Sequence, residues 1–129
     1  MLSTQPVDAL LLVTDLEVAR EFYGRTLGLE VLFEDGEQFI TFGCGGDSRL
    51  VVTKSSVGTK DEATKVSWRV DDIAAEVAGL RTRGVEILEF ADLNTVDGIA
   101  DVGFALAAWF EDPSKNSLGL LQLKGDAAH

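Results

Sequence analysis

Gly28-Leu29-Glu30-Val31-Leu32 has a second copy in the chain, Gly84-Val85-Glu86-Ile87-Leu88. Each copy follows an amphipathic stretch with an acidic start, Val13-Thr14-Asp15 in the first case and Val70-Asp71-Asp72 in the second. A repeat of this kind predicts one domain built from two copies of a strand–helix–strands unit. Two such half-sheets can enclose a pocket, so we expect the function to reside there.

The first repeat is expected to begin with a buried strand over residues 7–13, which are apolar on both sides of the pleat. Thr14 and Glu17 have the spacing of a capping box, so Thr14 is predicted to start a helix. The apolar stripe of that helix ends at Gly28, a residue suited to the left-handed position after a helix, and Tyr23 is expected to pack at the helix end. Three further strands are predicted, at about 29–34, 38–43 and 48–54.

The second repeat follows a polar linker over residues 55–64 and starts with a strand at 65–70. Its helix has Ile73, Val77 and Leu80 on one face and ends at Gly84. The remaining elements are predicted as a strand at 85–90, a long loop at 91–103, and strands near 104–111 and 117–123.

These patterns predict an α+β fold in which two βαβββ repeats form a curved mixed sheet around a pocket. We expect a single domain over residues 1–124 and a C-terminal tail at 125–129. Within the domain, repeat one covers about 7–54 and repeat two about 65–123.

Composition sets limits on the class of protein. The 129 residues fit one domain, and 46% of them are hydrophobic, which is enough for a real core. The net charge of −11 argues against nucleic acid as a partner. It would attract a cationic ligand, but acidity is also a common aid to solubility. No membrane span or signal peptide is evident and Cys44 is alone, so a soluble, cytoplasmic protein without a disulfide is expected.

Motifs at both ends of the chain resemble the vicinal oxygen chelate superfamily, which includes glyoxalase I, extradiol dioxygenases, fosfomycin resistance enzymes and bleomycin resistance proteins. The opening motifs are Val13-Thr14-Asp15-Leu16, Phe22-Tyr23 and Leu27-Gly28, and the closing motif is Trp109-Phe110-Glu111-Asp112-Pro113 with Asn116 and Leu118. Lys115 stands where the family usually has glycine, a position suited to positive φ. The resemblance implies that the chain pairs into a homodimer.

Enzymes of this family mostly hold a divalent metal with four side chains, whose places in this sequence are Asp8, Val51, Lys65 and Gly119. Only Asp8 offers a suitable donor, and the single histidine, His129, is the last residue. We therefore expect no metal and no other cofactor. An all-oxygen site for Mg²⁺ or Ca²⁺ from Asp8, Glu89 and Asp97 is the alternative.

Strand alternation divides the side chains between a helix-covered face and a pocket face. Arg49 and Thr53 fall on the pocket face, and Trp68 falls on the other. Trp109 occupies a place where related chains often carry an aromatic residue that touches the ligand, although core packing would also explain it. The predicted ligand pocket consists of Asp8, Leu10, Leu12, Val51, Lys65, Ser67, Arg69, Trp109, Gly119 and Leu121.

No catalytic residue is assigned. Lys65 and Asp8 are the candidates for an acid or base, and an inert salt bridge between them is the competing interpretation. Cys44 is interpreted as a hairpin thiol, and the terminal position of His129 argues against a Ser–His or Cys–His pair.

The preferred function is metal-independent binding or sequestration of a small molecule. The alternative is a cofactor-free or weakly metal-dependent lyase or isomerase of the glyoxalase type, acting on a small carbonyl compound. A third possibility is an interaction module without a ligand. The sequence leaves open the identity of the ligand, any turnover, and whether one chain or a dimer forms the pocket.

Overall fold

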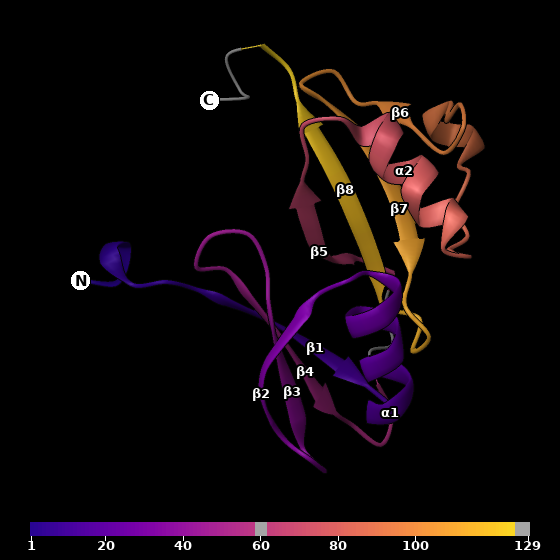
Figure 1. Ribbon diagram of the computed structural model, residues 1–129. Helices are drawn as coiled ribbons and strands as arrows, with labels where there is room; N and C mark the ends of the chain where they lie inside the picture. The colour runs from indigo at the N-terminus through magenta and orange to yellow at the C-terminus, as the bar shows by residue number, and fades with distance from the viewer. Residues whose placement is uncertain (59–61, 126–129) are drawn as a thin grey trace. The chain divides into compact units, whose positions relative to one another are not determined.

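The computed structural model describes residues 1–58 and 62–125, which belong to two compact units (Figure 1). Unit 1 comprises Met1–Asp61 together with Asp112–Asn116, and unit 2 comprises Glu62–Glu111 together with Ser117–His129. Each unit holds a four-stranded mixed sheet and a helix, in the order strand, helix, three strands. The predicted α+β class with two βαβββ repeats is therefore confirmed. The strands form two separate sheets.

The sheet of unit 1, here sheet A, has the strand order β1-β4-β3-β2. Strands β1 and β4 run parallel, and β3 is antiparallel to both β4 and β2. A single 3₁₀ turn, η1 (Leu2–Thr4), precedes β1. The strands are β1 (Asp8–Val13), β2 (Glu30–Asp35), β3 (Phe39–Gly43) and β4 (Arg49–Lys54).

The helix of unit 1 begins as α1 (Leu16–Ala19) and continues in wider π-helical turns as η2 (Arg20–Thr26). Its N-cap is Asp15, whose carboxylate accepts hydrogen bonds from the backbone N–H groups of Glu17 (3.0 Å) and Val18 (3.2 Å). The predicted cap at Thr14 is therefore wrong, because the carboxylate one residue later reaches the free N–H groups of the first turn. Gly28 ends the segment with φ 78°, the left-handed conformation that was predicted.

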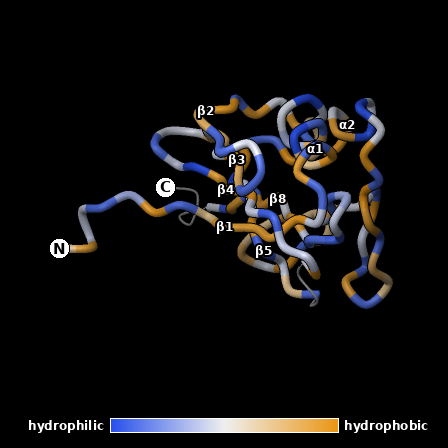
Figure 2. The backbone as a smooth tube through the Cα atoms, turned by 90° about the horizontal axis from the view of Figure 1, so that it is seen from below, coloured by the Kyte–Doolittle hydropathy of each residue, from blue (hydrophilic) through white to orange (hydrophobic). Residues whose placement is uncertain are grey.

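One face of sheet A packs under this helix and forms the core of unit 1. The buried side chains come from alternate strand positions and from the inner side of the helix. Strand β1 is hydrophobic along most of its length in Figure 2, yet only its alternate residues are fully buried. These core residues are Leu11, Val13, Ile40, Phe42, Leu50, Val52, Leu16, Ala19 and Tyr23.

The sheet of unit 2, here sheet B, has the order β5-β8-β7-β6. Its helix α2 (Ile73–Thr82) buries Ile73, Val77 and Leu80, as the periodicity predicted. The side chain of Asp72 caps the helix by accepting from the Ala75 N–H, and Gly84 follows the helix with φ 87°. The strands are β5 (Thr64–Arg69), β6 (Ala100–Asp101), β7 (Ala105–Glu111) and β8 (Ser117–Leu123).

Residues 85–90 do not form the predicted strand. Val85 and Ile87 are buried, and the Leu88 N–H donates to the Trp109 carbonyl (2.9 Å), but the segment forms no regular ladder with the described strands. The short helix η3 (Ala91–Leu93) follows, and β7 pairs with β8 on one side and with β6 on the other. Apolar alternation identified a buried segment correctly, whereas it could not show which segment pairs with β7.

Two predicted regions fall partly outside the described residues: 59–61 of the linker, and 126–129 of the C-terminal tail with His129. Within the part that is described, no helix is long and apolar enough to cross a membrane.

Candidate ligand-binding faces

The face of sheet A opposite its helix carries the first group of predicted site residues. Leu10 and Leu12 on β1 are 71% and 42% exposed, whereas Leu11 between them is 2% exposed. The ladder register places Leu10 beside Val51, and Val51 beside Thr41 on the next strand. We call this surface the open face of sheet A, and it consists of Asp8, Leu10, Leu12, Arg49, Val51, Thr53, Phe39, Thr41 and Phe33.

Asp8 and Arg49 form a bidentate ion pair at one end of this face. The Arg49 Nε donates to Asp8 Oδ1 at 3.0 Å, and Nη2 donates to Oδ2 at 2.7 Å. The parallel register of β1 and β4 sets the two residues side by side. The hydrogen bonds from Arg49 hold the pKa of Asp8 below its usual value, and those same bonds raise the pKa of Arg49. The sequence placed Arg49 on this face but did not predict the pair.

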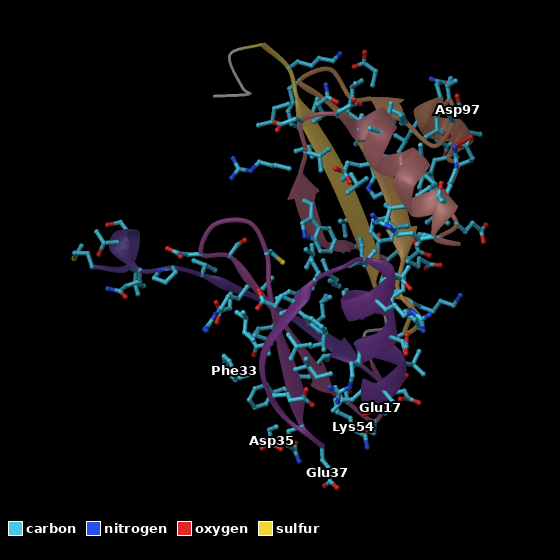
Figure 3. The ribbon with its side chains drawn as sticks, in the orientation of Figure 1. Glu17, Phe33, Asp35, Glu37, Lys54 and Asp97 are labelled. Atoms are coloured by element: carbon cyan, nitrogen blue, oxygen red, sulfur yellow. The ribbon has the colours of Figure 1, made fainter. Side chains whose placement is uncertain are left out.

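Phe33 lies on the outer strand of the open face. Its ring packs edge-on against the ring of Phe39, with centroids 6.0 Å apart, and the guanidinium carbon of Arg49 lies 5.6 Å from its centroid. Figure 3 shows Phe33 on the side of the sheet away from α1. Phe33 was absent from the predicted site because a register shift between Val31 and Phe33 interrupts the simple alternation of β2.

Thr41 is the one polar residue buried beneath this apolar surface. Its exposure is 1%, and its hydroxyl oxygen has no hydrogen-bond partner among the described residues. The register pairs Thr41 with Phe33 on one side and Val51 on the other. A buried hydroxyl without a partner is uncommon in folded proteins.

Sheet B carries the second group of predicted site residues. Gly119 pairs with Ser67 on one side and with Trp109 on the other, so these three share one face. Leu121 pairs with Arg69 in the next row. These residues were predicted as part of a ligand pocket, and their contact with a ligand stays a prediction.

The two tryptophans of unit 2 have different surroundings. Trp109 is half-buried and meets Phe90 edge-on, with centroids 5.4 Å apart. Trp68 is half-buried and stacks on the buried ring of Phe110, with ring centroids 6.3 Å apart, so it lies on the predicted helix-covered face without being fully buried. Lys65 lies at a register shift between β5 and β8, so simple alternation does not fix the direction of its side chain.

A buried polar network fixes the turn that joins β7 to β8. Asp112 Oδ2 accepts from the Tyr23 hydroxyl (2.6 Å) and from Asn116 Nδ2 (2.8 Å). Asp112 Oδ1 accepts from the backbone N–H groups of Ser114 and Asn116, both at 2.8 Å. Burial, followed by the negative charge of Asp112, raises the pKa of Tyr23 well above its usual value. Lys115 has φ 70°, so the positive φ expected at this place is confirmed.

The positions that would hold a metal in related enzymes do not fit one here. Val51 and Gly119 have no donor side chain, Lys65 carries an ammonium group, and both oxygens of Asp8 are bound to Arg49. Among the described residues, no group of three acidic, histidine or cysteine side chains lies close enough together to hold an ion.

Two surface recesses in the described part of unit 1 lie apart from the predicted pocket residues, although the smaller one includes Arg49 of the open face. The larger, of about 740 Å³, is polar and is lined in part by Glu17, Glu37 and Lys54, which Figure 3 labels. The smaller, of about 300 Å³, is lined in part by Cys44 and Arg49. None of the ten residues of the predicted ligand pocket lines either recess.

Comparison with known proteins gives one family and several similar structures. The sequence profile of the Glyoxalase/Bleomycin resistance protein/Dioxygenase superfamily matches residues 6–120. TnmS3, an antibiotic binding protein from Streptomyces sp. CB03234, is similar at 25% identity and a TM-score of 0.74, with 96% of this chain and 99% of that chain covered. No functionally curated protein matches significantly.

Two further structures share the fold at lower sequence identity. A member of the same superfamily from Sphaerobacter thermophilus DSM 20745 is 23% identical with a TM-score of 0.73, over 95% of this chain and 99% of that chain. Lactoylglutathione lyase from Agrobacterium tumefaciens is 19% identical with a TM-score of 0.68, over 92% of this chain and 93% of that chain.

Proposed function

The chain belongs to the Glyoxalase/Bleomycin resistance protein/Dioxygenase superfamily, and we propose that it binds a small organic molecule on its sheet faces without a metal ion. The observation that carries this proposal is the ion pair of Asp8 and Arg49. Asp8 is the only carboxylate among the four metal-ligand positions, and its two oxygens accept hydrogen bonds from the guanidinium. A metal ion at these positions would have to displace Arg49 from Asp8, and Asp8 would then be its one ligand from the four positions.

The chemistry of the open face supports an organic ligand. Leu10 and Leu12 are 71% and 42% exposed, although both belong to a strand of a folded sheet. Covering an exposed aliphatic or aromatic side chain contributes roughly 1.5–3 kcal/mol when burial is complete. Exposed apolar surface gathered around a few polar groups is typical of a binding site.

The similarity to TnmS3 supports binding in particular, because that protein is described as antibiotic binding. Lactoylglutathione lyase shares the fold at 19% identity, which carries no argument about activity. The alternative function, a lyase or isomerase that uses Asp8 as a base, is less well supported. The hydrogen bonds from Arg49 lower the pKa of Asp8 and so make its carboxylate a weaker base. Sequestration of a ligand therefore accounts for these residues better than turnover.

A thermal-shift screen of chelator-treated protein tests the proposal. The panel contains antibiotics and small carbonyl metabolites, and a ligand at 100 times its Kd adds about 2.7 kcal/mol to the free energy of unfolding. We expect stabilising compounds to be found without metal and to be recovered unchanged after incubation. Hits that require a restored divalent ion, or chemical conversion of a hit, would overturn metal-independent binding.

A pair of matched variants locates the site. Leu10→Ser changes an exposed leucine of the open face, and Val18→Ser changes an aliphatic side chain on α1 that is 44% exposed. We expect the first variant to weaken binding about tenfold and the second to leave it unchanged, with similar melting temperatures for both. Equal affinities in the two variants would place the ligand elsewhere.

The homodimer and the cytoplasmic location expected from the sequence are part of the same proposal. Sedimentation equilibrium tests the dimer directly. One chain has a mass of 13.9 kDa, and a measured mass of this value at all protein concentrations would contradict the homodimer.

A further inference from the structure

The hydroxyl of Thr41 is a buried polar group that lacks a partner on the open face of sheet A. The other two buried residues of β3, Ile40 and Phe42, are apolar and belong to the core under the helix. Valine has the shape of threonine without the hydroxyl, and would satisfy the same packing with no unpaired group. The hydroxyl of Thr41 therefore indicates a partner that is not part of the described chain.

The ring of Phe33 belongs to the ladder neighbour of this position. Phe33 is the ladder neighbour of Thr41, and side chains of such pairs lie on the same face in contact. Its ring lies between the ring of Phe39 and the guanidinium of Arg49. These two residues flank the position of Thr41 along the strands, so the Phe33 ring lies level with Thr41. Phe33 remains 49% exposed, and its strand β2 is the outer strand of the sheet, with a neighbour on one side only.

The surroundings of the Phe33 ring define what can replace it. An edge-on aromatic ring on one side and a guanidinium on the other favour a flat aromatic group between them. The bonds from Arg49 to Asp8 use Nε and Nη2, so the guanidinium is fixed in place while it stacks. The hydroxyl of Thr41, once uncovered, donates to an oxygen acceptor on such a group.

We propose that Thr41 anchors a planar aromatic carbonyl compound, which reaches the hydroxyl when the Phe33 ring moves aside and takes the place of that ring between Phe39 and Arg49. This inference rests on the proposed function and names its ligand class. Phe33 is then the cover of the site, and Thr41 is the residue that selects for the carbonyl oxygen.

The experiment compares acetylnaphthalene with ethylnaphthalene, two ligands of similar size of which only the first has a carbonyl oxygen. Kd values are measured by NMR titration of metal-free protein. The wild type should bind acetylnaphthalene about tenfold more tightly, the effect of one good hydrogen bond. Thr41→Val should abolish this preference and leave the affinity for ethylnaphthalene unchanged.

Thr26→Val is the matched control, because Thr26 is a half-buried threonine of the same unit that lies on η2, outside the open face of sheet A. It should keep the full preference. Phe33→Ala should keep the preference and bind acetylnaphthalene more tightly than the wild type, since no ring has to be displaced. Loss of binding in Phe33→Ala would show that the ring is a contact surface and would overturn its role as a cover.

The outcomes separate this inference from the proposed function. A preference for the carbonyl that survives in Thr41→Val overturns the role of Thr41. Failure of both naphthalenes to bind overturns the ligand class, while the proposed function stands if other compounds stabilise the metal-free protein. If no compound in either experiment binds, both proposals are wrong.

Discussion

Replacing Tyr23 with phenylalanine should destabilise the protein, although no contact with a ligand is involved. Tyr23 is 0% exposed and Asp112 is 3% exposed, so neither group can turn to water for a replacement hydrogen bond. The change removes one of four donors to the Asp112 carboxylate without leaving a large cavity. A hydrogen bond to a charged group contributes about 1.5–3 kcal/mol. For a domain of this size, that corresponds to a fall of roughly 5–12 °C in melting temperature.

The pH dependence of the same variant gives a second, independent measurement. The pKa of Tyr23 is raised in the folded protein, so its contribution is fully present below the unfolded value of about 10 and declines as the pH rises above it. The difference in melting temperature between the wild type and Tyr23→Phe should therefore shrink between neutral pH and strongly alkaline pH. Because the chain has one tyrosine, tyrosinate absorbance follows this group alone. A change in melting temperature of less than one degree at neutral pH, or a difference that grows in alkali, would show that the hydrogen bond from Tyr23 to Asp112 does not stabilise the fold.

Four other substitutions test three separate features. Arg49→Met should raise the pKa of Asp8 toward its ordinary value, as followed by NMR of the carboxyl carbon, because the bonds that lower it are lost; an unchanged value would contradict the pairing. Lys115→Gly should be neutral or stabilising by up to about 1 kcal/mol in thermal melts, because φ is 70°, and a clear loss would show that the lysine side chain has a role. Asp15→Ala should cost about 0.5–2 kcal/mol in denaturant unfolding and Thr14→Ala less, since Asp15 is the cap; the reverse order would restore the predicted capping box.

The helices and most strands could be predicted because their signals are local. The apolar spacing of Ile73, Val77 and Leu80 located α2, and Gly28 and Gly84 marked the ends of helical segments through their need for positive φ. Where two local signals competed, the sequence was less reliable. Thr14 and Asp15 are both good cap residues, and the backbone path into α1 selects the second.

The contacts that define the candidate site depend on register, which a local pattern does not contain. Arg49 meets Asp8 because β1 and β4 pair in parallel with these residues opposite each other. In the sequence, Tyr23 occupies one of the apolar positions of its helix. Its hydroxyl donates to Asp112 because the turn between β7 and β8, far away in the sequence, brings that carboxylate beside it. An unpaired hydroxyl such as that of Thr41 is visible only when the burial and the neighbours of each atom are known.

Isothermal titration calorimetry shows whether the ligand binds without a metal ion. The strongest hit of the metal-free screen is titrated into chelator-treated protein, and again after addition of Zn²⁺ or Mn²⁺. We expect the same Kd in each case, because Asp8 is held by Arg49 and the other three positions lack a suitable donor. Binding that appears, or tightens by tenfold or more, only in the presence of the ion would contradict it.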